Sequence, residues 1–170
     1  YRQRPTPPGG AMFKVVGKWT EQKTHVRKLT GKEVFTKFIR FWDKAGTSGG
    51  RGPFTAGVLL GEQDNGLTWV LGVERFRMDV WGREQAILDQ AKLDCRRWRD
   101  VVVGLEQEPG SGGKESLQAT VRRLKGYTVW WWKVDSTTGG KELRAEPWAA
   151  QVNAGNVVLL DDGAGGSLWN

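Results

Sequence analysis

The short run DVVVGLE at residues 100–106 constrains the fold more than any other stretch of the sequence. It is almost continuously apolar, which is typical of a strand buried on both faces of a parallel or mixed sheet. Residues 81–95 before it are patterned as an amphipathic helix, with Ile87, Ala91 and Asp94 close together at helical spacing. Residues 113–124 after it form the next predicted helix. A buried strand between two helices predicts an α/β fold.

The remaining pattern predicts a central mixed sheet of five to six strands flanked by helices. Residues 37–43, 54–61 and 67–77 are predicted strands, and the turn signal EQDNG between the last two favours an antiparallel hairpin. Further strands are predicted at residues 127–134 and 156–160, and a further helix at residues 144–153. Residues 1–12 contain three of the six prolines and read as an extended linker. We therefore expect residues 1–34 to be a junction and residues 35–170 to form one domain.

Composition narrows the classes of partner. The formal net charge of +7 raises the expectation of a polyanionic partner, nucleic acid first. Cys95 is the one cysteine, so an internal disulfide framework is excluded. No apolar run approaches the length of about 18 residues that a transmembrane helix needs, so a membrane partner is not expected.

Two acids stand where predicted strands end. Asp43 closes the strand at residues 37–43, and strand alternation places Glu106 at the carboxyl end of the run at residues 100–106. If these strands are neighbours, the two carboxylates come close together and would repel without a cation between them. Oxygen ligands of this kind suit Mg²⁺ or Mn²⁺. Glu108, just past the same strand, is a weaker candidate ligand, and the alternative is that these acids are solvated turn residues.

The glycine-rich stretch GSGGK at residues 110–114 is not a P-loop, because the first glycine and the Ser or Thr after the lysine are absent. That argues against a nucleotide-binding enzyme. The stretch is either a helix start that binds a backbone phosphate or a purely structural loop. Lys44, Lys114, Lys141 and Arg144 lie at or after strand ends and are candidate DNA-backbone contacts.

The run Trp130, Trp131 and Trp132 lies in a predicted strand. Its side chains could stack on bases. In a strand, however, at least one side of the run is expected to be core, either Trp131 or the pair Trp130 and Trp132.

Several long patterns, among them FIRFWDKAGT, GLEQEPGSGGKES and LRAEPWAAQVNAGNV, resemble the large terminase subunit of tailed bacteriophages. The resemblance is to its carboxyl-terminal nuclease domain and covers almost the whole chain. It implies a ribonuclease H-like fold and a divalent-metal-dependent endonuclease that cuts concatemeric viral double-stranded DNA. It also implies an ATPase motor domain earlier in the same full-length chain, a small terminase subunit and a portal protein as partners, and action in the host cell cytoplasm during virus assembly.

Within this resemblance, Asp43 matches the first-strand metal ligand and Glu106 the second acid, with Glu108 as a substitute. The family also places an Asp on a later helix, in a stretch similar to DDQVD. Asp161 and Asp162 follow the last predicted strand, but they precede a glycine-rich loop instead. The resemblance therefore implies a domain incomplete at its carboxyl end, whose third ligand is missing from this chain and which need not cut DNA. The alternative function is a non-catalytic DNA-binding or motor- or portal-docking module of the same fold.

Overall fold

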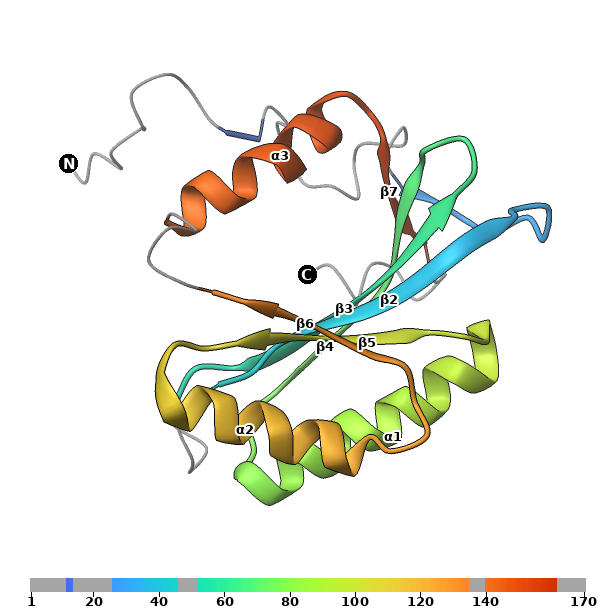
Figure 1. Cartoon of the computed structure of the whole chain (residues 1–170). Helices are drawn as coiled ribbons and strands as arrows, with labels where there is room; N and C mark the ends of the chain where they lie inside the picture. Colours follow the sequence, from blue (N-terminus) through green and yellow to red (C-terminus); the bar gives the residue numbers. More distant parts are fainter. Residues whose placement is uncertain (1–11, 14–25, 46–51, 135–139, 162–170) are drawn as a thin grey trace.

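A computed structural model describes residues 12–13, 26–45, 52–134 and 140–161 of the chain. This described part is an α/β unit with a mixed seven-stranded sheet and three helices (Figure 1). The strands are β1 (Val26–Arg27), β2 (Phe35–Asp43), β3 (Thr55–Gln63), β4 (Thr68–Phe76), β5 (Val102–Gln107), β6 (Val129–Lys133) and β7 (Val157–Leu160). The helices are α1 (Val80–Trp98), α2 (Gly110–Arg123) and α3 (Lys141–Asn153). Residues 1–11 of the linker expected at residues 1–12, and Asp162, lie outside the described residues.

The strand order across the sheet is β1-β7-β4-β3-β2-β5-β6, and β3 alone runs against its described neighbours. The predicted β3–β4 hairpin is confirmed. Its turn closes through Gly66, which adopts a φ of 83° that favours glycine. The other six strands are parallel to one another, so their carboxyl ends share one edge of the sheet. Asp43 and Glu106, the two acids singled out in the sequence, lie at these carboxyl ends.

The expectation of five to six strands is wrong, because the described part of the chain has a seven-stranded sheet. β1 has two residues and pairs in parallel with β7, Val26 opposite Leu159. A strand of two residues has no visible alternation, so its sequence pattern could not reveal it. The sheet therefore extends into the stretch expected to be a junction.

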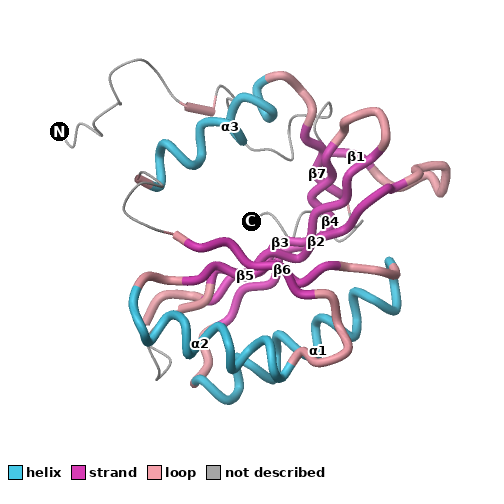
Figure 2. Tube along the Cα trace, viewed as in Figure 1, coloured by secondary structure: helices cyan, strands magenta, loops and turns pink. Residues whose placement is uncertain are grey.

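Helices cover both faces of the sheet: α1 and α2 lie against one face and α3 lies over the other (Figures 1 and 2). Trp42 of β2 and Leu105 of β5 are buried against Ile87 of α1 and Leu117 of α2. Because side chains alternate along a strand, the residues next to Trp42 and Leu105 face the α3 side. The sheet face with α1 and α2 is thus the main core, and the strand-end acids belong to the other face.

A buried ion pair joins β2 to α1 within the main core. The Arg40 guanidinium donates to both carboxylate oxygens of Asp94, and both side chains are 4% exposed. Arg40 also donates to the Gly57 carbonyl of β3 at 3.2 Å. Gln90 donates to Asp94 as well, at 2.9 Å. These bonds satisfy both charges and fix the middle of β2 relative to α1.

The expectation that one side of the tryptophan run is core is wrong. Trp130, Trp131 and Trp132 are 46%, 49% and 49% exposed. The physical reason is the place of β6, which is an edge strand with β5 as its partner in the sheet. At an edge, side chains on either face have neighbours on one flank only.

Candidate functional site

Asp43 and Glu106 end two neighbouring parallel strands. Trp42 of β2 is in register with Leu105 of β5, so the next residue on each strand is one of the two acids. Trp42 and Leu105 are buried on the side of α1 and α2, so by alternation both acids face the other way. Both residues also line one cavity of about 450 Å³ at the strand ends, whose other walls come largely from α1 and α2. The two strands are therefore neighbours, which is the condition on which the predicted approach of the two acids depends.

Glu108 lines the same cavity beyond the end of β5. The first turn of α2 packs closely on its backbone: a Cβ at Gly113 would lie 2.2 Å from the Glu108 carbonyl oxygen. Gly110, which begins α2, has a φ of 88°. The glycine-rich stretch therefore has a clear packing role, which is one of the two interpretations left open by the sequence.

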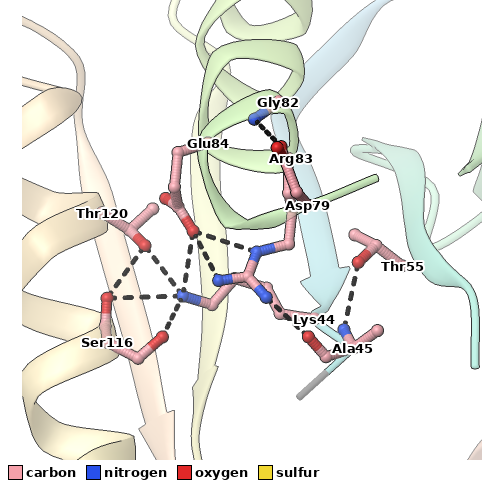
Figure 3. Close-up of polar contacts among 9 residues, drawn as sticks. All are labelled: Lys44, Ala45, Thr55, Asp79, Gly82, Arg83, Glu84, Ser116 and Thr120. Atoms are coloured by element: carbon pink, nitrogen blue, oxygen red, sulfur yellow. Dashed lines mark hydrogen bonds and ion pairs between the residues drawn. The ribbon is translucent and has the colours of Figure 1, made fainter. Parts of the chain in front are cut away.

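Lys44, the residue after Asp43, turns inward between α1 and α2 (Figure 3). Its ammonium donates to Ser116 Oγ at 3.0 Å and Thr120 Oγ1 at 2.8 Å, and lies 3.6 Å from Glu84 Oε1. Its side chain is 10% exposed. Burial lowers the pKa of Lys44, and the Glu84 carboxylate opposes that shift. The ammonium is thus committed to internal partners instead of the DNA phosphate that we expected.

The backbone beyond Lys44 is held from two directions (Figure 3). Arg83 of α1 donates to the Ala45 carbonyl oxygen at 2.5 Å. The Ala45 N–H donates to Thr55 Oγ1 of β3 at 3.0 Å. Together with the contacts of Lys44, these bonds fix the chain directly after Asp43. Asp43 therefore stands on a backbone that three elements support.

Acids outnumber bases among the side chains that line the cavity. Lys44 and Arg83 both contact Oε1 of Glu84, so this carboxylate offsets one of their two positive charges. The other oxygen, Glu84 Oε2, is buried and has no hydrogen-bond partner among the described residues. The remaining lining acids are Asp43, Glu106 and Glu108. The cavity thus keeps an excess of negative charge at the strand ends.

Arg144 of α3 reaches Glu106 on the sheet face that α3 covers. Its Nη1 lies 3.5 Å from Glu106 Oε2, and the two side chains are 30% and 26% exposed. A partly exposed ion pair at this distance contributes little to the free energy of unfolding. It does, however, partly neutralise Glu106, which the sequence did not indicate.

The other two basic candidates are Lys114 and Lys141, and the structure describes the side chain of Lys114 alone of these two. Lys114 is exposed on the first turns of α2, where a phosphate could reach it. Lys141 begins α3, but its side chain lies outside what the structure describes.

Sequence reasoning missed Glu84 as part of the site. A signal was present, because Glu84 precedes Ile87, Ala91 and Asp94 at the spacing of the buried face of α1. An acid on an apolar helix face needs a partner, and here the partners are Lys44 and Arg83.

The donor chemistry of the cavity fits a hard divalent cation. Asp43 and Glu106 offer carboxylate oxygens from adjacent strands, and Glu108 lines the same cavity. Within the described ranges, no three Asp, Glu, His or Cys side chains gather closely enough to hold an ion by themselves. A Mg²⁺ ion is commonly held by one or two carboxylates, with water and substrate phosphate completing its coordination. The strand-end acids are the groups that would hold it here.

Replacing Lys44 by methionine is expected to lower the free energy of unfolding by about 1–3 kcal/mol. Thr120 and Ser116 would lose a buried donor, and Glu84 would lose one of its two cations. Urea unfolding followed by circular dichroism measures the change. Lys114→Met is the matched control on exposed α2 surface, expected to stay within about 0.5 kcal/mol of the wild type. Equal stability of the two variants would contradict a structural role for the Lys44 ammonium.

No family model and no curated protein matches the chain. Among the described helices, none combines the length and apolar character needed to cross a membrane.

Proposed function

We propose that this chain is a divalent-metal-dependent endonuclease domain of ribonuclease H-like fold, of the kind that phage terminase large subunits carry. Its substrate would be concatemeric double-stranded DNA, cut by phosphodiester hydrolysis. One observation carries the proposal: Asp43 and Glu106 end adjacent parallel strands and line one cavity. Carboxylates at neighbouring strand ends repel one another, a bound divalent cation would relieve that repulsion, and such cations assist phosphodiester hydrolysis.

The architecture around these acids supports the same proposal. The resemblance implies a central mixed sheet with acidic residues on it and helices around it. β2 and β5 lie inside the sheet, β3 runs against its neighbours, and helices flank both faces. The acids therefore stand on rigid strands, which hold catalytic groups more accurately than loops do.

Each residue of the site has a proposed role. Asp43 and Glu106 would hold the cation, with Glu108 as the third candidate ligand. The chemistry supplied by a bound divalent cation would be polarisation of a phosphoryl oxygen and activation of water. Arg144 would balance part of the charge on Glu106 until a cation does so. Lys44 would keep the backbone after Asp43 in place, through its bonds to α2.

DNA binding would be independent of the DNA sequence. Lys114, Lys141 and Arg144 are the proposed phosphate contacts, in a chain whose net charge is +7. Such binding weakens steeply as salt rises, because phosphate contacts release counterions. By resemblance, the proposed partners are an ATPase motor domain in the same full-length chain, a small terminase subunit and a portal protein. The proposed place of action is the host cell cytoplasm during virus assembly.

A second candidate is a non-catalytic DNA-binding or docking module of the same fold. The observation that favours it is that no three Asp, Glu, His or Cys side chains in the described ranges, Glu108 included, gather closely enough to hold a metal ion. A protein with this sheet could keep its basic surface and its contacts to a motor or portal without cutting.

Incubation of the chain with supercoiled plasmid separates the two candidates. With Mn²⁺ or Mg²⁺ at low salt, the nuclease proposal expects nicked and linear DNA on an agarose gel, and intact plasmid when EDTA is present. Gel retardation of the same plasmid in EDTA measures DNA binding alone. If the chain retards DNA but leaves it supercoiled with both metals, the nuclease proposal is wrong and the docking module is favoured.

A further inference from the structure

Aromatic side chains form a row on the same sheet face as the two acids. Trp130 and Trp132 are two residues apart on β6, so they share a face, and their ring centroids are 6.2 Å apart. Phe41 of β2 continues the row, with its ring centroid 6.4 Å from that of Trp130. The row crosses β5 at Gly104, where a Cβ would lie 2.6 Å from Phe41. A glycine at that position lets the aromatic rings lie across the strand.

The register ties this row to the acids. Trp132 is the partner of Glu106 across the β5–β6 ladder, and Trp130 is the partner of Gly104. Phe41 lies two residues before Asp43 on β2. Trp131, by contrast, is the partner of Leu105, which is buried on the face of α1 and α2. The exposed rings of Trp130 and Trp132 therefore adjoin the acidic strand ends, and Trp131 points the other way.

We propose that Trp130 and Trp132 form a stacking platform for the bases of an unpaired DNA segment next to the acidic strand ends. These rings keep 46% and 49% of their surface exposed, although burial of large aromatic rings is strongly favourable. Bases stack on exposed aromatic side chains whatever their sequence. Charge for the DNA backbone on this face would come from Arg144 of α3, whose Nη1 lies 3.5 Å from Oε2 of Glu106, the ladder partner of Trp132.

Base stacking and the position of the platform are supported by different observations. The stacking itself rests on the exposed rings of Trp130 and Trp132. The position of the platform beside the cleaved phosphodiester rests on the proposed function. A single-stranded segment is preferred over intact duplex because the bases of a duplex already stack on one another and offer no free face.

The test is binding of a fluorescently labelled oligo-dT strand to the full chain, measured by fluorescence anisotropy in EDTA, with a duplex of equal length alongside. Trp130→Ala/Trp132→Ala is expected to weaken oligo-dT binding by at least about fivefold, the lower end for loss of one stacked base. Duplex binding is expected to change less. Trp131→Ala is the matched control, equally exposed on the other face, and is expected to bind oligo-dT as the wild type does.

Equal weakening by Trp131→Ala, or unchanged binding by the double variant, overturns the proposal. Self-association of the wild type that the double variant loses, with unchanged DNA binding, also overturns it and assigns the edge strand to a protein contact. EDTA removes cleavage from the binding measurement. Failure of the stacking proposal can therefore be told apart from failure of the nuclease proposal. A chain that stacks oligo-dT through these rings but never cuts plasmid contradicts the nuclease function alone.

Discussion

Replacing Asp43 by asparagine is expected to reduce metal-dependent plasmid cleavage by on the order of 100-fold or more. Asparagine has nearly the same shape but no charge, so the end of β2 would lose its contribution to holding a divalent cation. Loss of several kcal/mol of charge stabilisation corresponds to at least two decades in rate, at about 1.4 kcal/mol per decade. Initial rates of conversion of supercoiled to nicked plasmid with Mn²⁺ measure the effect.

Three comparisons make this first prediction specific. Glu106→Gln is expected to lower the rate similarly, because Glu106 ends the neighbouring strand and lines the same cavity. Asp64→Asn, at an exposed position of the β3–β4 turn, is expected to keep the wild-type rate. Calorimetric titration with Mn²⁺ is expected to show weaker binding for both site variants. Wild-type cleavage by Asp43→Asn would remove Asp43 from the proposed site.

The largest expected effect on stability comes from Asp94→Ala. This change would leave the Arg40 guanidinium buried at 4% exposure without its carboxylate. Breaking a buried ion pair in this way costs about 3–5 kcal/mol, because the remaining charge has neither water nor a carboxylate partner, although it keeps its bond to the Gly57 carbonyl oxygen. A domain has about 5–15 kcal/mol of stability in total, so the variant is expected to be partly unfolded at moderate urea concentrations. Urea titration followed by circular dichroism measures the shift.

The control for this second prediction is Asp89→Ala on the same helix. Asp89 also pairs with a cation, Lys92 at 2.7 Å, but its side chain is 53% exposed. The expected cost of losing that pair is below about 1 kcal/mol. A second variant, Arg40→Met/Asp94→Leu, is expected to recover part of the loss by removing both charges. If Asp94→Ala and Asp89→Ala cost the same, the buried pair has no special role in holding β2 to α1.

Much of the fold could be predicted because its main elements carry periodic patterns. The apolar run of β5, the Asn65-Gly66 turn and the buried stripe of α1 each follow from residue type and spacing. Helix ends were less predictable. α2 begins at Gly110 instead of residue 113, since a run of glycines has low helix propensity and gives no start signal. β1 was missed because two residues cannot display a period.

For the candidate site, the sequence predicted the position of the acids but not their surroundings. Asp43 and Glu106 could be placed because strand alternation and parallel ends are local rules. The inward turn of Lys44 depends on Ser116 and Thr120, more than 70 positions later in the chain. The exposure of Trp131 depends on β6 lying at an edge, which local alternation does not reveal.

The pairing of β1 with β7 has a consequence for the order of folding. Val26 and Leu159 come from opposite ends of the described chain, and β7 also pairs with β4 over three residues. Closing so long a loop costs chain entropy that two paired residues can barely offset. The β2–β3–β4 meander, by contrast, needs only short loops. We expect the meander to form early, and the β1 edge to be the last part of the sheet to assemble and the first to open.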